Sequence, residues 1–475
     1  MPVSAAYRPD PTLPALGPEF GDPVRAADFP KTTLRFRNDR AAATVGLDTL
    51  TDVEWVAHLG RFAPLPGNIH PPLALRYHGH QFRSYNPDLG DGRGFLFAQM
   101  REAGSGRLLD LGTKGSGQTP WSRAGDGRLT LKGGVREVLA TAMLEALGVP
   151  TSRSFSLIET GEALMRGDEP SPTRSSVLVR LSHSHVRFGS FQRHAFHDSA
   201  ERIGALTDHV IGAYYPELAA ANDRAAALLG AVVDRSARLV ARWMAAGFVH
   251  GVLNTDNMNI TGESFDYGPY RFLPNNDPNF TAAYFDSSGL YAFGRQPETM
   301  FWNLQELAGC LRLVSGNEPL VDALNGFGPA YHRELVAAML ERLGLEARSP
   351  EDDQGLVQAA FQSLAAGGER VRWEPFFFDW FCGEPARALA GPRASLYGEE
   401  GFADFRERLG TYAPHRPERL AHLYFSRPEP EELLYDQIEA LWAPIAEADD
   451  WSVFEAKLEG IETARVAWGL AGQGT

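Results

Sequence analysis

The segment "HGVLNTDNMNI", His250 to Ile260, combines residue types that phosphoryl-transfer enzymes place in a catalytic loop. In the kinase version of that loop a His comes first, a proton-accepting Asp follows two positions later, and a metal-binding Asn follows seven positions after the His. Here Asn257 stands at the expected spacing from His250, but Val252 replaces the Asp and has no group that accepts a proton. The segment is therefore either a disabled kinase loop or a site that does related chemistry in another geometry.

Three oxygen-bearing side chains in and after this segment form a candidate metal and proton-acceptor site. We expect two strand-like pieces joined by "TGES" to bring Asn257 together with Asp266, which lies in "DYG". Mg²⁺ in nucleotide sites is commonly held by one or two such oxygens plus phosphates. Asp256 is the carboxylate that can replace what Val252 lacks. The alternative is a turn at Asp266, a local cap at Asn257 and a supporting role for Asp256; His250 we expect to be structural.

Lys114 and Glu137 form a second candidate pair. Lys114 lies in "DLGTKGSGQTP" after a strand-like run, and Glu137 lies early in the following predicted helix. A strand Lys matched to a Glu on the next helix positions nucleotide phosphates in kinases. The alternative is a solvated surface lysine, with Arg136 competing to pair with the neighbouring acids.

Two glycine turns flank this lysine in the sequence, "LGDGRGF" (89–95) and "AGDGRL" (124–129). Glycine lets backbone N–H groups approach phosphate oxygens, and a neighbouring Arg adds charge-assisted hydrogen bonds. Both turns are equally compatible with ordinary hairpins, because Asp-Gly is a common hairpin dipeptide.

Arg180 and Arg187 lie seven positions apart in "LVRLSHSHVRFGSF". Across a hairpin the two guanidinium groups could face one pocket and clamp a polyphosphate bidentately. The alternative is a pair of surface arginines.

The elements that must position these residues divide into a sheet-bearing part and a helical part. Strand-like runs at 92–100 and 106–117 predict a hairpin, 130–150 predicts a helix, and strand character resumes after it. After about residue 195 the chain is mainly helical, and the first 75 residues predict an arm or cap with little regular structure. The predicted fold class is α+β, a small β-rich lobe followed by a larger helical lobe, in a protein-kinase-like outline with N- and C-terminal extensions.

Composition excludes several classes of protein. The 475 residues carry a formal net charge of -15, which argues against a broad nucleic-acid-binding face. Two cysteines, Cys310 and Cys382, fit buried core positions and provide no zinc or disulfide framework. We find no secretory signal and no stretch apolar enough to span a bilayer, so we expect a cytoplasmic, monomeric protein that does not bind membranes.

Five motifs together resemble the selenoprotein O family, also called SelO or YdiU: "YHGHQFRSYNPDLGDGRG", "KGSGQTPWSRAGDGR", "VREVLATAMLEALGVPTSRS", "VLVRLSHSHVRFGSF" and "GFVHGVLNTDNMNI" with "DYGPY". The resemblance implies a kinase-fold enzyme that transfers AMP from ATP, or UMP from UTP, to Ser, Thr or Tyr hydroxyls of proteins. It also implies a nucleotide bound in the reverse orientation, so that the α-phosphorus faces the acceptor. A base at the usual kinase position is then dispensable, and Val252 does not predict inactivity.

The resemblance also assigns roles to individual residues. It implies Asp256 as the proton acceptor, Glu137 as the partner that holds Lys114, and Asn257 with Asp266 as ligands of Mg²⁺ or Mn²⁺. The implied nucleotide-binding set is Gly90, Gly92, Arg93, Lys114, Asp126, Gly127, Arg180, Arg187 and Asp266. The predicted domains are an arm (1–75), a kinase-like N-lobe (76–195), a C-lobe (196–400) and a C-terminal helical extension (401–475).

The chain also departs from the family pattern. It ends "WGLAGQGT", without the terminal selenocysteine or cysteine of many members, so we do not expect redox control through a terminal thiol. The segments "RSYNPDLGDGRGF" and "GPYRFLPNNDPNF" differ from the usual pattern, and the region beyond about residue 330 has no close match. A true phosphotransferase that uses the γ-phosphate and a non-catalytic nucleotide-binding scaffold stay open as alternatives.

Overall fold

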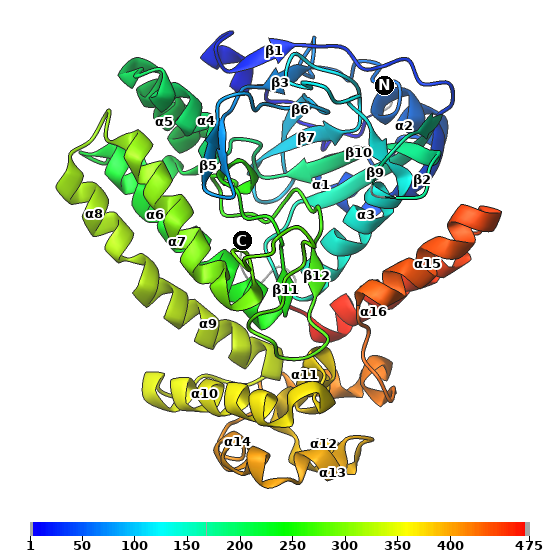
Figure 1. The fold of residues 1–475 in the computed structure, drawn as a ribbon, viewed down its shortest axis with the longest axis vertical. Helices are drawn as coiled ribbons and strands as arrows, with labels where there is room; N and C mark the ends of the chain where they lie inside the picture. Colours follow the sequence, from blue (N-terminus) through cyan, green and yellow to red (C-terminus); the bar gives the residue numbers. More distant parts are fainter. Residues whose placement is uncertain (1–2, 168, 471–475) are drawn as a thin grey trace.

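A computed structural model describes residues 3–167 and 169–470, and it divides into a sheet-bearing N-terminal part and a helical C-terminal part (Figure 1). The antiparallel sheet has the strand order β1-β3-β6-β7-β10-β9-β2, with β8 pairing beside β10. Its strands are β1 (Gly21–Pro23), β2 (Thr33–Arg37), β3 (Leu73–Leu75), β6 (Leu96–Arg101), β7 (Leu108–Lys114), β8 (Leu129–Thr130), β9 (Arg153–Leu164) and β10 (Thr173–Ser182). The predicted hairpin over 92–117 is confirmed as β6 and β7.

Both faces of this sheet are buried, and the alternation of side chains divides them between two cores. Leu157 and Leu178 face the core beneath α3 (Leu131–Ala146), whereas Ile158 and Val179, one residue further along, face a core built around α1 (Asp39–Thr44) and α2 (Asp52–Leu59). A strand with period-two side chains contributes to both layers in this way. The sheet is therefore fixed from both sides.

The α3 helix covers the face of the sheet that bears the candidate phosphate-binding cations. Its N-terminus is capped by Thr130, whose hydroxyl accepts a hydrogen bond from Gly133 N at 3.1 Å, and Gly148 ends it with φ +74°. The predicted helix over 130–150 is thus confirmed. In the β7–β10 register Arg180 pairs with Gly112 and Leu178 with Lys114, so Lys114 and Arg180 point to the same face.

The remaining helices follow β10 and build the second part of the molecule (Figure 1). They are α4 (Phe188–Phe196), α5 (Ala200–Tyr214), α6 (Arg224–Ala245), α7 (Gln296–Leu311), α8 (Asn317–Asn325), α9 (Phe327–Leu343), α10 (Pro350–Gly367), α11 (Trp373–Asp379), α12 (Pro385–Ala390), α13 (Ala394–Tyr397), α14 (Ala403–Leu409), α15 (Tyr435–Ala448) and α16 (Ser452–Trp468). The chain returns at its end, because α16 packs along α3. None of the helices in the described ranges is long and apolar enough to cross a membrane.

Two short strand pairs lie outside the large sheet. The β4–β5 hairpin (Gly79–Gln81 and Ser84–Asn86) precedes β6, and β11 (Phe248–Val249) pairs with β12 (Arg271–Phe272) around the catalytic-loop candidate. The prediction that strand-like pieces joined by "TGES" carry Asn257 and Asp266 is wrong. That segment makes only isolated bridges, Arg187 with Asn259 and Thr151 with Ser264, because its backbone bonds to other loops.

The expectation of an irregular N-terminal arm is also wrong. Within the first 75 residues β1 and β2 form the two edges of the large sheet, and β3 pairs with β6. These strands are three to five residues long, and such short runs carry little periodic signal. Both cysteines are buried and free, as predicted. The last residues of "WGLAGQGT", 471–475, lie outside the described part of the chain.

A buried ion pair connects three helices of the C-terminal part. Arg342 on α9 is 2% exposed, and its Nη2 lies 2.5 Å from Oε2 of Glu374 on α11. The guanidinium carbon also lies 4.9 Å from the ring centroid of Trp468 at the end of α16. Removing one member of such a pair leaves the other charge buried without compensation.

We therefore expect Arg342→Ala to lower the free energy of unfolding by about 3 to 5 kcal/mol, measured by urea denaturation. Arg333→Ala on the same helix is the matched control, because its side chain is 64% exposed and should change stability by less than about 0.5 kcal/mol. Equal effects of the two substitutions would contradict a structural role for the buried pair.

Candidate active site

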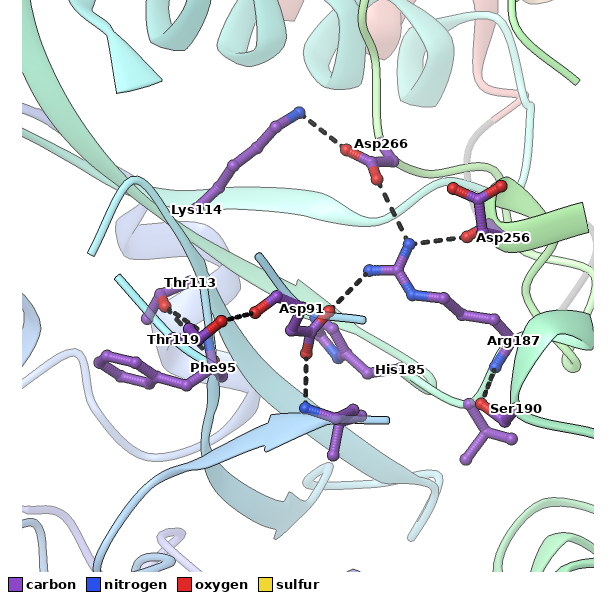
Figure 2. Close-up of polar contacts among 12 residues, drawn as sticks. Asp91, Phe95, Thr113, Lys114, Thr119, His185, Arg187, Ser190, Asp256 and Asp266 are labelled. Atoms are coloured by element: carbon purple, nitrogen blue, oxygen red, sulfur yellow. Dashed lines mark hydrogen bonds and ion pairs between the residues drawn. The ribbon is translucent and has the colours of Figure 1, made fainter. Parts of the chain in front are cut away.

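Asp266 lies at the centre of a cluster of three cations that come from different parts of the sequence. Lys114 Nζ is 2.8 Å from its Oδ1, Arg180 Nη1 is 3.5 Å from the same oxygen, and Arg187 Nη1 is 3.3 Å from Oδ2. Figure 2 shows the Lys114 and Arg187 side chains pointing at this carboxylate. The side chain of Asp266 is 22% exposed, so a ligand can approach the cluster from that side.

The lysine–glutamate pair expected from the sequence is present. Lys114 Nζ donates to Glu137 Oε2 at 2.6 Å, and Glu137 is 1% exposed. Arg180 Nη1 lies 3.5 Å from the other oxygen of Glu137. Glu137 reaches both cations because α3 lies across the face of the sheet that bears them. One carboxylate thus holds the end of β7 and the middle of β10 in a fixed relation.

Arg187 is the most enclosed of the three cations. It is the residue before α4, not one arm of a hairpin with Arg180, so that part of the sequence prediction is wrong. Its Nη1 donates to the backbone carbonyl of Asp256 at 2.7 Å, and its guanidinium carbon lies 4.7 Å from the ring centroid of Phe265. The expected convergence of Arg180 and Arg187 is nevertheless present, because both contact Asp266.

Asp91 is a member of this cluster that the sequence reading missed. Its Oδ1 lies 3.3 Å from Arg187 Nη2, and its Oδ2 accepts a hydrogen bond from Leu75 N at 3.1 Å (Figure 2). The "LGDGRGF" turn drew attention for its glycines and its arginine, and an Asp-Gly dipeptide gives no sign that its carboxylate is buried. Asp91 links the first glycine turn to the cations.

Asp256 has an environment opposite to that of Asp266. Its side chain is buried, and burial raises the pKa of its carboxyl group to about 6, although the positive charge of Arg187 opposes the shift. Its Oδ1 has no hydrogen-bond partner among the described residues. For Asp266, burial alone would raise the pKa, but Lys114, Arg180 and Arg187 together hold it well below the usual value. Neighbouring carboxyl groups with separated pKa values are typical of acid–base sites.

The β4–β5 hairpin packs directly on the catalytic-loop candidate. Gly79 is needed there, because a Cβ at this position would lie 2.8 Å from Oδ1 of Asp256. His80 N donates to the Thr255 hydroxyl at 2.7 Å, and Phe82 N donates to Oδ1 of Asn254 at 3.1 Å. These contacts join residues more than 170 positions apart, which the sequence patterns did not indicate.

His250 supports the other side of the loop. Its Nε2 lies 3.1 Å from the carbonyl oxygen of Phe265, and because a carbonyl only accepts, Nε2–H is the donor. Burial lowers the pKa of this imidazole, which keeps it neutral. The ring therefore fixes the backbone next to Asp266 and is not placed to exchange protons with a substrate.

The donor set at Asn257 and Asp266 suits a hard divalent cation. Asn257 Nδ2 donates to the Val252 carbonyl at 3.0 Å, which leaves the amide oxygen as the free ligand atom. Within residues 3–167 and 169–470 no cluster of three or more His, Cys, Asp or Glu side chains could hold a metal by itself. One carboxylate and one amide oxygen nevertheless fit Mg²⁺ or Mn²⁺, which complete their coordination with phosphates and water.

The two glycine turns lie against each other. A Cβ at Gly90 would lie 2.3 Å from Cγ of Trp121, and one at Gly127 would lie 2.3 Å from the backbone of Gly117. The Arg93 carbonyl accepts from Gly115 N at 2.6 Å, directly after Lys114. The turns therefore build one loop layer next to the lysine.

The polar side chains of these turns do not join the Asp266 cluster. Arg93 is exposed, and Asp126 is exposed and paired with Arg166 at 2.8 Å. Among the contacts of the described residues, none connects Arg93, Asp126, Gly90, Gly92 or Gly127 to Asp266. Their assignment to nucleotide binding stays a prediction.

A mixed α/β fold, a buried lysine–glutamate pair and a polar loop with two differently tuned aspartates define a protein built to handle a phosphorylated substrate. Residues 3–462 match the family model described as "Protein adenylyltransferase SelO". The chain therefore belongs to the SelO family, and the resemblance seen in its motifs is confirmed.

Relatives named "Protein nucleotidyltransferase YdiU" match nearly the whole chain. The protein from Synechocystis sp. is 46% identical over 479 residues, which cover 96% of this chain and 98% of that protein. The one from Gloeobacter violaceus is 47% identical over 460 residues, covering 94% and 93%. The one from Trichormus variabilis is 44% identical over 470 residues, covering 96% and 95%.

The charge balance of the cluster predicts how the chain responds to loss of Asp266. We expect Asp266→Asn to destabilise the ligand-free protein by about 3 kcal/mol, because three enclosed cations lose their shared counter-ion. Added ATP in metal-free buffer should raise the melting temperature of this variant more than that of the wild type, because phosphate oxygens replace the carboxylate. Differential scanning calorimetry with and without ATP measures both effects.

Asp322→Asn is the control for this substitution, because Asp322 is exposed on α8. If Asp266→Asn is no less stable than Asp322→Asn, the cations do not depend on Asp266 for their compensation.

Proposed function

We propose that this chain is a protein nucleotidyltransferase that transfers AMP from ATP, or UMP from UTP, to Ser, Thr or Tyr hydroxyl groups of proteins and releases pyrophosphate. Family membership supports the reaction class. The observation that carries the assignment of residues is the separation of the two aspartates, one with a pKa of about 6 and one held ionised. A base near neutrality and a permanent anion for a metal are the two carboxylates that this reaction needs.

In the proposed reaction the acceptor hydroxyl oxygen forms a bond to the α-phosphorus. The bond from that phosphorus to the bridging oxygen breaks, and pyrophosphate leaves with the electron pair. The hydroxyl proton passes to the carboxylate of Asp256. Lys114, Arg180 and Arg187 would exchange Asp266 for phosphate oxygens, which keeps each cation paired during binding.

We further propose that Asn257 and Asp266 hold Mg²⁺ or Mn²⁺. When bound, such an ion neutralises phosphate charge and stabilises the leaving group. Gly90, Gly92, Arg93, Asp126 and Gly127 are proposed to line the nucleotide, and Glu137 is proposed to position Lys114. The support for these roles is that both glycine turns pack beside Lys114 and that Glu137 contacts its ammonium group at 2.6 Å.

We propose a kinase-like bilobal arrangement for this fold, with an N-lobe at 76–195, a C-lobe at 196–400 and a C-terminal extension at 401–475. The arm at 1–75 adds edge strands to the N-lobe sheet. The sheet-bearing part, the α3 glutamate and the polar loop beyond α6 support this division. A monomeric state, a cytoplasmic location and the absence of nucleic-acid and membrane partners stay predictions.

The transferred group is the direct test of the proposal. Incubation with ATP labelled at either the α- or the γ-phosphate, with Mg²⁺ or Mn²⁺ present, should label protein from the α position only. Candidate protein substrates are included, so that a lack of self-modification is not decisive. Label from the γ position would overturn the proposal in favour of a phosphotransferase, and binding without any transfer would favour a nucleotide-binding scaffold.

The base assignment predicts a dependence on pH. A base works only when deprotonated, so kcat/KM should rise about tenfold per pH unit below pH 6 and level off above it. Asp256→Asn should lower kcat/KM by about 10²- to 10⁴-fold and abolish this slope. ATP affinity, measured by calorimetry, should stay within about threefold of the wild type, because no phosphate contact is removed.

Loss of ATP binding in Asp256→Asn would assign Asp256 to the metal or to the loop structure. Stability gives a second readout that does not depend on activity. The folded-state pKa of Asp256 is above its ordinary value, so the free energy of unfolding contributed by this group falls as pH rises through 6. Asp256→Asn should remove that fall.

A further inference from the structure

A second basic cavity lies outside the Asp266 cluster. It has a volume of about 560 Å³ and is bounded by the α3–β9 connection, the end of β10, α6 and the loop that leads to Asp266. Its charged lining residues are six arginines and three glutamates: Arg40, Arg107, Arg153, Arg235, Arg238, Arg465, Glu102, Glu145 and Glu263. The volume suits a small organic ligand, and the lining has a formal excess of positive charge.

The three glutamates of this cavity are already engaged. Glu145 accepts from Arg40 Nη1 at 2.9 Å, and Glu102 pairs with Arg107 Nη2 at 2.9 Å. Glu263 Oε2 accepts from the backbone N–H of His183 at 2.8 Å. Arg153 is only loosely held, because its nearest carboxylate oxygen, on Glu102, is 3.5 Å away. The acids of the lining therefore leave part of its positive charge without a partner.

Arg235 and Arg238 carry this uncompensated charge. They lie three positions apart on α6, and in the part of the chain that the structure describes neither has a carboxylate within 4.0 Å. Arg238 Nε is buried and has no hydrogen-bond partner among the described residues. Arg235 lies with its guanidinium carbon 4.0 Å from the ring centroid of Tyr215, which holds the side chain in one orientation.

The electrostatics around Arg238 agree with an excess of positive charge. Burial lowers the pKa of this guanidinium, and the nearby positive charge of Arg242 lowers it further. A half-buried cation without a counter-ion costs stability, and an anionic ligand offsets that cost. Residues three apart on a helix lie side by side, so two guanidinium forks meet at one edge of the cavity.

We propose that this cavity binds a small diphosphate-bearing molecule through Arg235 and Arg238, at a site separate from the Asp266 cluster. Two adjacent forks match two linked phosphate groups, each taken bidentately. Val149, Pro150 and Leu470 provide an apolar wall against which an attached organic group can pack. Inorganic pyrophosphate and a nucleoside diphosphate share this chemistry.

The walls of the site are hydrogen-bonded to the backbone that carries Asp266. Ser264 N donates to the Pro150 carbonyl at 2.9 Å, and Ser152 N donates to the Ser264 carbonyl at 2.9 Å. Gly262 has φ +68° and packs so closely on Arg235 that a Cβ would lie 2.6 Å from Cβ of that residue. A ligand held by Arg235 therefore rests on the segment that places Asp266, although its binding does not depend on the proposed catalysis.

Equilibrium dialysis of the full chain with labelled inorganic pyrophosphate, in buffer with EDTA, tests the site. We expect Arg235→Gln/Arg238→Gln to weaken one class of pyrophosphate sites by about 30-fold and to leave the Lys114-dependent class unchanged. Lys114→Met should do the reverse. Arg312→Gln/Arg333→Gln, which removes two exposed arginines from elsewhere, is the charge-matched control.

Arg235→Lys/Arg238→Lys guards against a folding defect, because it keeps both charges and loses the forks; its affinity should lie between those of the wild type and the glutamine variant. Repeating the titration with ADP separates the sources. Binding tighter than that of pyrophosphate by about tenfold or more identifies a nucleotide site, and equal affinity identifies a diphosphate site. Pyrophosphate and ADP binding that is unchanged in Arg235→Gln/Arg238→Gln would overturn the inference.

Discussion

The contact of one carboxylate with three cations is the constraint on which the rest of the site depends. Lys114, Arg180 and Arg187 come from β7, β10 and the start of α4, and Asp266 holds all three within 3.5 Å. Without it, three positive charges would face each other in a largely dry space, where repulsion is strong. The sheet, α3 and the loop after α6 must therefore pack in a single arrangement, because only that arrangement brings the cations to Asp266.

The same cluster explains why two aspartates of one loop behave so differently. Asp266 contacts the cations through its carboxylate, whereas Arg187 contacts Asp256 through the backbone carbonyl. The side chain of Asp256 therefore has burial without compensation, and its pKa rises to about 6. A change of one hydrogen-bonding atom, from carboxylate to carbonyl, thus separates a permanent anion from a group that can take up a proton near neutral pH.

The sequence predicted the parts of this arrangement that depend on regular local patterns. Lys114 and Glu137 were paired correctly because a strand and a capped helix of ordinary length carry them. Asp91 could not be predicted, since a buried Asp and an exposed turn Asp look alike before Gly. The short strands of the first 75 residues and the link between His80 and Thr255 depend on contacts distant in sequence, which no local periodicity records. The family motifs indicated which residues matter, but not that Asp266 holds the cations together.

The close packing of the β4–β5 hairpin on the loop has a consequence for fidelity. An activated nucleotide beside a carboxylate base is vulnerable to water, which is smaller and more abundant than any protein hydroxyl. With Gly79 against Asp256 and the hairpin tip bonded to Asn254, one side of the base is covered by backbone. An acceptor must then enter from the remaining side, where a folded partner can displace solvent as it docks. In this arrangement the hairpin favours transfer to a macromolecule over wasteful hydrolysis.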